Sequence, residues 1–398
     1  MKNRLSIQER NQVLQSMKDL VKSKAKELLK ANEKDMSSFD QNDIAMYDRL
    51  KVDQDKIEGM EASLEQLAGQ EDPLNHERFR FVHDNGLEII NKTAPFGTVL
   101  IIYESRPDVT IEAAGIAFKS GNRILLKGGK EALNSNLFLV NLWHEALKMN
   151  GLDSSWVTYL NYDRSKTQEF LRNPDQPLDL IIPRGGEKLI DFVKEHAKCP
   201  VIVSGRGNNF AYIAPDAELD MALSIVTNAK VAKISACNAL DKVLIDENHP
   251  EFRDRYLKLT EQLLEHQVKI LRSPDLPEID GTELLTKEGV WYEEFLDYKI
   301  VIGSVKGLDE AVSKINRYGG GHSATIISND NEKAGQFQDE VDAAAVYHNA
   351  STRFTDGFQF GLGGELAIST DKLHQRGPIG LNHLVTNKWY VHGKGQVR

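Results

Sequence analysis

The most reactive group that the sequence offers is a single thiol in a run of small residues. Cys237 is one of two cysteines in 398 residues, and Ser235, Ala236 and Ala239 lie close to it. The apolar run at 243–245 follows, which is typical of a buried strand. A thiolate is a strong nucleophile toward acyl carbons, and small neighbours let a substrate approach it. The alternative is a buried structural cysteine, which is the commoner role of an isolated thiol.

Composition excludes several classes of function. A chain of 398 residues with 40% hydrophobic residues is too long to fold around a single hydrophobic core, so we expect two or three domains. The net charge of −10 argues against nucleic acid as the main partner, because phosphate binding needs a basic face. Two distant cysteines provide neither a disulfide framework nor metal-ligand spacing, so we expect no metal site. The first ten residues lack an apolar signal core and no run is long enough to span a membrane, so we expect a cytoplasmic protein.

The N-terminal part of the chain has helical periodicity and then a hairpin signal. Apolar residues recur at helical spacing over 7–30 and 44–67, and the polar segment 31–35 is expected to end the first helix. Two alternating runs flank Asp84-Asn85-Gly86, a strong hairpin signal. A hairpin outside any strand–helix alternation is typical of an arm, here over residues 79–91.

Repeated strand–turn–helix units follow the hairpin. Apolar runs at 95–103, 121–127 and 178–182 each end in a polar or glycine-rich turn and lead into a helical pattern. Such repeats predict a doubly wound, largely parallel sheet, and a second α/β unit at 233–355. Ligands of such sheets lie at the carboxyl ends of the strands. The sequence lacks a G-x-G-x-x-G after a predicted strand, so the standard dinucleotide fingerprint is missing.

Longer motifs extend in order over nearly the whole chain. They are IYESRPDVT at 102–110, LKGGKEA at 126–132, DLIIPRGGE at 179–187, SACNAL at 235–240, INRYGGGHS at 315–323 and NASTRFTDG at 349–357. On these motifs the sequence resembles the gamma-glutamyl phosphate reductase family of the aldehyde dehydrogenase superfamily. The resemblance implies an α/β, aldehyde dehydrogenase-like fold, with two doubly wound α/β domains plus a β oligomerisation arm.

The resemblance also implies a division of labour along the chain. Residues 1–232 would form the cofactor-binding domain, with the 79–91 hairpin as its arm. Residues 233–355 would form the catalytic domain that carries the nucleophilic cysteine. Residues 356–398 would form a return segment and a C-terminal oligomerisation tail, so the family resemblance implies a dimer or tetramer.

The reaction implied is the NADPH-dependent reduction of L-glutamyl 5-phosphate to L-glutamate 5-semialdehyde plus phosphate, the second step of proline biosynthesis from glutamate. Cys237 occupies the nucleophile position and would carry the acyl group as a thioester. Ser105 lies where the superfamily has a side-chain donor to the oxyanion, although Ser105 also fits a simple turn residue. A functional association with glutamate 5-kinase would accompany this step.

Other positions carry over from the family motifs, each with a structural alternative. For the cofactor they are Lys127 on the adenosine ribose or its 2′-phosphate, Gly185 and Gly186 beside the pyrophosphate, and Glu294 on the nicotinamide ribose. Without the resemblance, Lys127 and Glu294 would be interpreted as solvated surface charges. For the substrate's phosphate and carboxylates the candidates are Arg106, Arg184 and Arg353, because a guanidinium fork fits such groups. Structural salt bridges are an equal alternative for each arginine.

Two competing functions are an oxidising aldehyde dehydrogenase that uses NAD and water, and a non-catalytic member of the superfamily. Oxidising members keep a glutamate base ahead of the nucleophile, and here no carboxylate occurs between Glu195 and Asp216. The intact SACNAL motif argues against a non-catalytic protein. The segment 203–209 departs from the family pattern, so no role is carried over to it.

Overall fold

The computed structural model describes residues 4–39 and 44–398 and divides them into two compact units. The first unit comprises the described residues up to Val203 together with Gly361–Ala367 and Pro378–Arg398. The second unit comprises Ser204–Phe360 and Ile368–Gly377.

These units differ from the boundaries expected from the sequence. The division falls at residue 203 and not at 232, because strand β7 (Asn209–Ile213) and helix α9 (Leu219–Val231) pack into the second unit's sheet and core. The segment 356–398 is no separate body, because its parts belong alternately to the two units. The alternation of strands and helices continues across residue 232, so the sequence pattern held no signal for the true boundary.

The first unit is built on a four-stranded parallel sheet in the order β5-β4-β3-β6. Its strands are β3 (Thr98–Tyr103), β4 (Arg123–Lys127), β5 (Val157–Tyr159) and β6 (Leu180–Arg184). Successive side chains of a strand point to opposite faces. On β3, Val99 and Ile101 therefore join one hydrophobic core, and Leu100 and Ile102 join another. Both faces of the sheet are consequently buried, as a parallel sheet requires.

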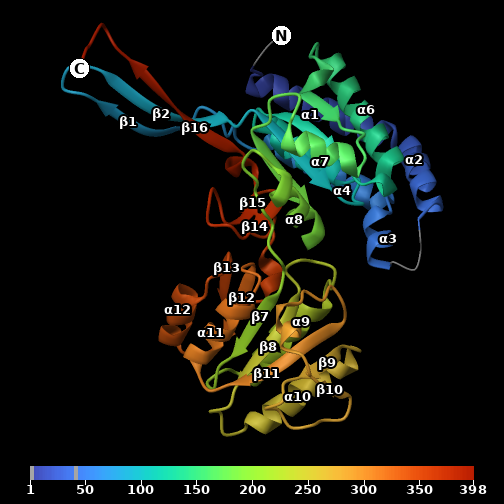
Figure 1. Ribbon diagram of the computed structural model, residues 1–398, viewed down its shortest axis with the longest axis vertical. Helices are drawn as coiled ribbons and strands as arrows, with labels where there is room; N and C mark the ends of the chain where they lie inside the picture. The colour runs from blue at the N-terminus through green and yellow to red at the C-terminus, as the bar shows by residue number, and fades with distance from the viewer. Residues whose placement is uncertain (1–3, 40–43) are drawn as a thin grey trace. The chain divides into compact units, whose positions relative to one another are not determined.

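Helices cover the two faces of this sheet (Figure 1). The larger core receives side chains from α1 (Ile7–Ser23), α2 (Ala25–Ser37), α4 (Gln54–Gly69), α5 (Val109–Lys119) and α6 (Leu133–Met149). The smaller core receives side chains from α7 (Arg164–Arg172) and α8 (Glu187–His196). Helix α3 (Ile44–Leu50) lies between α2 and α4 in the chain. This arrangement on both faces confirms the doubly wound architecture.

The expected helix break at residues 31–35 is wrong. The chain breaks at Lys24, and α2 continues to Ser37. Two polar residues of the segment, Asn32 and Asp35, are buried and have distant partners, whereas Glu33 and Lys34 are exposed. The Asn32 amide donates to the Leu50 carbonyl at 2.9 Å, and Asp35 accepts from the backbone N–H of Ser135 at 2.8 Å. Polar residues that usually favour turns are therefore tolerated inside the helix.

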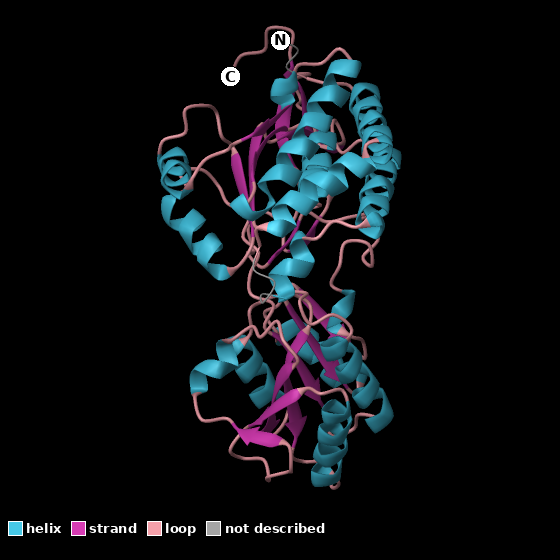
Figure 2. Cartoon of the chain, turned by 90° about the vertical axis from the view of Figure 1, so that its right-hand side faces the viewer, coloured by secondary structure: helices cyan, strands magenta, loops and turns pink. Residues whose placement is uncertain are grey.

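The second unit is built on a seven-stranded parallel sheet in the order β10-β9-β11-β8-β7-β12-β13. Besides β7, its strands are β8 (Leu240–Asp246), β9 (Lys269–Arg272), β10 (Thr282–Leu284), β11 (Lys299–Val305), β12 (Ser323–Ile327) and β13 (Ala345–His348). Helices α9 and α10 (Phe252–Glu265) pack on one face, and α11 (Leu308–Tyr318) and α12 (Asn331–Glu340) pack on the other. Figure 2 shows the strands of each unit flanked by helices.

Short elements complete the two units. Two strands, β14 (Ala367–Ser369) and β15 (Gly377–Ile379), pair with each other where the chain passes between the units. Single-turn helices occur at Lys130–Ala132, Ser154–Trp156, Glu288–Tyr292, Thr352–Phe354 and Leu381–His383.

The expected hairpin is confirmed, and a third strand joins it. Strands β1 (Glu77–Val82), β2 (Glu88–Pro95) and β16 (Val385–His392) form an antiparallel sheet in the order β1-β2-β16. Gly86 adopts φ +82° in the connecting turn, a conformation that suits glycine. Phe79, Phe81, Trp389 and Val391 are each about half exposed, so this sheet presents apolar side chains to solvent. Within the described ranges, no helix combines the length and apolar character needed to cross a bilayer.

Candidate active site

The first unit gathers one group of candidate residues at the carboxyl ends of its strands. Strands β4, β3 and β6 are parallel neighbours, and Lys127 lies opposite Ile102 while Arg184 lies opposite Tyr103. The turn that begins at Glu104 follows β3 directly. The structure therefore places the ends of these strands at one edge of the sheet, which is where doubly wound folds bind ligands.

Ser105 lies in the turn after β3 and is almost completely buried. Its hydroxyl has no hydrogen-bond partner among the residues that the structure describes. Buried hydroxyls are almost always paired, so an unpaired one at an edge where doubly wound folds bind ligands needs an explanation. A donor that is reserved for a bound molecule is one such explanation.

The two arginines of this edge lie among carboxylates. Arg106 Nη2 pairs with Asp108 Oδ2 at 2.8 Å, which supports the salt-bridge alternative for Arg106. Burial raises the pKa of the Glu112 carboxyl to about 7, and the charge of Asp108 adds to this effect, while Arg106 and Arg184 oppose it. The edge is therefore a mixed cluster of cations and carboxylates.

Lys127 ends β4 and is half-buried. Its ammonium donates to the Gly128 carbonyl at 2.8 Å. Burial lowers the pKa of Lys127, while the charges of Glu131 and Asp163 raise it. A cation at this place suits an anionic ligand, although the two carboxylates already offset part of its charge.

Gly185 and Gly186 precede α8 and have different surroundings. A Cβ at Gly185 would lie 2.5 Å from the Glu104 carboxyl carbon, so the glycine accommodates that side chain. A Cβ at Gly186 would meet nothing within 4 Å, which leaves open space at the start of the helix. A helix N-terminus attracts anions. Here Glu104 Oε2 accepts from the Gly186 N–H at 3.2 Å.

In the second unit, Cys237 lies in the loop between α9 and β8, and its side chain is half-buried. The Asn209 amide nitrogen donates to the carbonyls of Cys237 at 2.8 Å and Ala239 at 2.7 Å. A Cβ at Gly207 would lie 1.9 Å from the Cys237 carbonyl oxygen, so only glycine permits this approach. The loop is thus fixed from one side by the segment that leads into β7.

The segment 352–355 fixes the Cys237 loop from a second side. The Asn238 amide donates to the carbonyls of Arg353 at 3.2 Å and Thr355 at 3.0 Å. In return, the Thr352 hydroxyl donates to the Asn238 carbonyl at 2.8 Å. The nucleophile candidate is consequently presented by a loop whose backbone has little freedom.

Arg353 lies close enough to Cys237 for a direct electrostatic interaction. Burial lowers the pKa of the Arg353 guanidinium, while the charges of Cys237 and Asp356 raise it. Its Nε and Nη1 atoms are buried, and within the described part of the chain they have no hydrogen-bond partner. The structure thus brings together Cys237 and one of the three candidate arginines, with two donors of that arginine unused.

Glu294 also belongs to the second unit and is half-buried. It lies between the single-turn helix Glu288–Tyr292 and β11, in a turn where Leu296 adopts φ +50°. The backbone on both sides of Glu294 hydrogen-bonds to side chains of β8.

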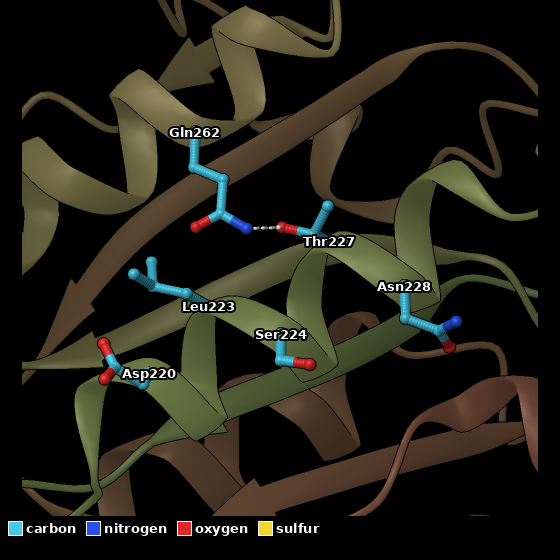
Figure 3. Close-up of a pocket in the computed structure, with 6 residues that line it drawn as sticks. All are labelled: Asp220, Leu223, Ser224, Thr227, Asn228 and Gln262. Atoms are coloured by element: carbon cyan, nitrogen blue, oxygen red, sulfur yellow. Dashed lines mark hydrogen bonds between the residues drawn. The ribbon is translucent and has the colours of Figure 1, made fainter.

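A hollow of about 430 Å³ on the second unit lies between α9 and α10 (Figure 3). Gln262 on α10 donates to the Thr227 hydroxyl on α9 at 2.8 Å. The rest of the lining consists of Asp220, Leu223, Ser224 and Asn228, so the hollow contains none of the candidate residues. In the ranges 4–39 and 44–398, no group of three or more His, Cys, Asp or Glu residues has metal-binding geometry.

Sequence reasoning missed the residues that fix the backbone of the Cys237 loop. Gly207 and Asn209 lie in the divergent segment to which no role was carried over. The only sequence feature that pointed to this segment is the adjacent pair Asn208 and Asn209 ahead of a buried strand. Such a pair does not reveal that the partner of Asn209 lies nearly thirty residues away.

The fold agrees with the comparisons with known proteins. The model of the aldehyde dehydrogenase family matches residues 2–270 and 291–389. An acetylating aldehyde dehydrogenase from Geobacillus thermoglucosidasius shares the fold, with a TM-score of 0.71 at 16% identity over 100% of this chain and 94% of that one. The protein is therefore an oxidoreductase of the aldehyde dehydrogenase family, as its motifs indicated.

Relatives within that family are more similar still. A gamma-glutamyl phosphate reductase from Clostridium perfringens is 42% identical over 88% of this chain and 84% of its own length. One from Gloeobacter violaceus is 44% identical over 88% and 83%. The crystal structure of the Thermotoga maritima reductase has a TM-score of 0.91 at 38% identity, covering 99% of this chain and 95% of that one. Within the aldehyde dehydrogenases, the chain belongs to the gamma-glutamyl phosphate reductases.

Proposed function

We propose that the protein reduces L-glutamyl 5-phosphate to L-glutamate 5-semialdehyde with NADPH, releasing phosphate, as a step of proline biosynthesis. The observation that carries the proposal is the presentation of Cys237 in a clamped loop beside a cation with unused donors. The relatives' shared name, gamma-glutamyl phosphate reductase, supports the choice of substrate.

Cys237 performs the covalent steps of the proposed reaction. Its thiolate attacks the acyl carbon, a C–S bond forms, and the bond to the phosphate oxygen breaks with the electron pair leaving on phosphate. NADPH, when bound, supplies the hydride that reduces the thioester carbonyl. The resulting alkoxide re-forms a carbonyl and expels the Cys237 thiolate, which frees the aldehyde. The released phosphate takes up one proton from solvent, so charge and atoms balance.

The polar groups around the thiol have separate tasks in this proposal. The Arg353 guanidinium favours the thiolate and offers Nε and Nη1 donors to the phosphate. The Ser105 hydroxyl and the Cys237 backbone N–H are the donors proposed for the oxyanion. Ser105 fits this task because its buried hydroxyl has no partner in the described structure. Arg106 and Arg184 are proposed to bind the substrate's carboxylate end.

The residues proposed for NADPH are Lys127, Gly185, Gly186 and Glu294. Gly186 fits because space is open at the start of α8, and Lys127 fits because its ammonium is a half-buried cation at the end of β4. Preference for the 2′-phosphate would rest on Lys127. A Lys127→Gln variant is expected to lose about tenfold in kcat/KM with NADPH and little with NADH. Equal losses with both cofactors would remove Lys127 from this role.

The assembly of the protein is part of the same proposal. We assign cofactor binding mainly to the first unit and catalysis to the second unit, which carries Cys237. We assign oligomerisation to the 79–91 hairpin and the 356–398 tail, in a dimer or tetramer. The half-exposed Phe79, Phe81 and Trp389 support an arm that covers a second copy. Cytoplasmic localisation and association with glutamate 5-kinase, both expected from the sequence, complete the proposal.

The reverse reaction tests the proposal, because glutamyl phosphate is labile. Purified protein would be given glutamate semialdehyde, phosphate and NADP⁺, and NADPH formation would be followed by absorbance. We expect turnover that requires phosphate and disappears in Cys237→Ala. Turnover without phosphate would indicate an oxidising aldehyde dehydrogenase, and turnover in the variant would exclude the thioester.

A further inference from the structure

A β-bulge lies just after the Cys237 loop, at the start of β8. Asn209 and Phe210 of β7 are consecutive, but they pair with Leu240 and Lys242 of β8, so Asp241 is an extra residue. Neighbouring residues of a regular strand point to opposite faces. A bulge interrupts this alternation and re-aims side chains. Here it lets both Asp241 and Lys242 reach the same segment, residues 293–295.

The two side chains hold the backbone on either side of Glu294. Lys242 Nζ donates to the Glu293 carbonyl at 2.8 Å. The Phe295 N–H donates to Asp241 Oδ2 at 2.8 Å. Glu294 is therefore bracketed by two hydrogen bonds from side chains of one strand.

The ring of Phe295 lies close to two lysine side chains. Lys242 Nζ lies 3.9 Å from the ring centroid and Lys299 Nζ lies 4.2 Å from it. Lys230 pairs with Asp241 at 2.9 Å, and their side chains are 0% and 3% exposed. An aromatic ring attracts cations, most strongly where water is excluded. The aromatic contacts thus reinforce the two hydrogen bonds.

Burying these charged side chains costs free energy, because they lose contact with water. Burial lowers the pKa of Lys242 to about 7, with Asp241 and Glu293 raising it and Lys230 and Lys299 lowering it further. A buried charge is tolerated only where its partners are well placed. A hydrophobic residue would fill this place at lower cost, so the charges are better explained by what they position.

We propose that Asp241 and Lys242 are positioning residues, which hold the 293–295 segment so that Glu294 is fixed for the nicotinamide ribose. The inference rests on the proposed function, which assigns that role to Glu294. It adds a specific consequence: one strand, β8, carries the end of the nucleophile loop and also fixes the carboxylate that orients the cofactor.

Hydrogen exchange of the ligand-free protein tests the clamp without reference to activity. In Lys242→Met, the amide of Phe295 is expected to exchange about tenfold faster, because the segment loses one of its two anchors. Amides of Ile300 and Ile302 in β11 should keep their wild-type rates. Lys242→Arg, which keeps a cation and a donor, should restore most of the protection. Unchanged exchange at Phe295, or equal acceleration in β11, would overturn the proposal.

NADPH affinity then connects the clamp to Glu294. The dissociation constant would be measured from NADPH fluorescence for wild type, Lys242→Met, Glu294→Gln and the double variant. We expect about a tenfold weakening in Lys242→Met and no further weakening when it is added to Glu294→Gln, because both act through one group. Additive losses would show that Lys242 does not act through Glu294. Absence of NADPH binding in the wild type would contradict the proposed function, while the exchange result would still decide the clamp.

Discussion

The two cysteines of the chain occupy environments of opposite character. Cys199 follows α8 and packs beside the smaller core of the first unit. Burial raises the pKa of its thiol to about 11, with Asp179 adding to the effect. Cys237 has a similar degree of exposure but lies in a loop anchored by amides and faces a guanidinium. The two thiols therefore differ in their neighbouring charges and loop anchors and not in their exposure, and these differences are what favour Cys237 as the proposed nucleophile.

The largest expected effect comes from removing each thiol in turn. Cys237→Ala is expected to lower the reverse reaction by about 10⁴-fold or more, because no other group can hold the acyl intermediate. Cys199→Ala should stay within about twofold of wild type, since its thiol is kept protonated. Initial rates of NADPH formation would measure both. Comparable losses of reverse-reaction rate in the two variants would show that Cys237 is not the only thiol that the reaction needs.

The second prediction concerns the backbone that presents Cys237. Gly207→Ala would place a Cβ 1.9 Å from the Cys237 carbonyl oxygen, so the loop must move. A displacement of about 1 Å at a reacting atom costs about 100-fold in rate, and we expect kcat to fall by that factor.

Gly335→Ala is the matched control for this substitution. Gly335 lies in α12, and its added Cβ would meet nothing within 4 Å. We expect wild-type kcat and a slightly higher melting temperature, because alanine favours a helix. Equal kcat in the two glycine variants would show that Gly207 does not set the position of the thiol.

The third prediction isolates the charge beside the nucleophile. Arg353→Met is expected to slow alkylation of Cys237 by iodoacetamide at pH 7 by about tenfold, because the thiolate loses a favourable cation. Peptide mass spectrometry would assign the modified cysteine. Exposed Arg317, which pairs with Glu288, provides the control as Arg317→Met. A rate unaffected by Arg353→Met would leave the phosphate as the only proposed partner of that arginine.

The smallest effect belongs to Cys199 and appears in stability. Its pKa is raised from an ordinary value of 9.0 to about 11, so the unfolded chain loses this proton first as the pH rises. The unfolded state then binds fewer protons, and stability falls as the pH increases from about 9 to 11. Compared with Cys199→Ala, the wild-type urea midpoint should decline more steeply in that window. Parallel pH profiles would contradict the raised pKa.

Periodicity predicted the alternation of strands and helices, but not the boundary between the two units. The alternation of apolar runs and glycine-rich turns is local, so β3, β4 and β6 and the edge they form could be predicted from the sequence, as could the hairpin around Gly86. The helix through Asn32 and Asp35 could not, because the partners that satisfy these side chains lie elsewhere in the chain.

The candidate site could be predicted where a residue belongs to a recognisable motif. It could not be predicted where a residue matters because of its three-dimensional contacts. Cys237 stands in a short motif of small residues, which made it visible. Asn209 donates to backbone carbonyls of the Cys237 loop, and Gly207 leaves room for one of them. Every residue has a backbone carbonyl, so a pattern of residue types does not reveal these contacts. The bulge at Asp241 is likewise invisible, since a single extra residue does not change the apolar run that follows.

The contact between Glu104 and the first turn of α8 has a consequence for ligand exchange. The Gly186 N–H already has a carboxylate for a partner, so an incoming phosphate group must displace one anion to take its place. Such competition weakens binding of any single anion at the helix terminus by a modest factor, since one exposed charge there contributes about 0.3–1 kcal/mol. Free phosphate, which the proposed reaction releases, is smaller than a dinucleotide and would make fewer contacts, so the loss would be a larger share of its binding free energy. In the proposed cofactor site, a dinucleotide held at several points would tolerate the same loss.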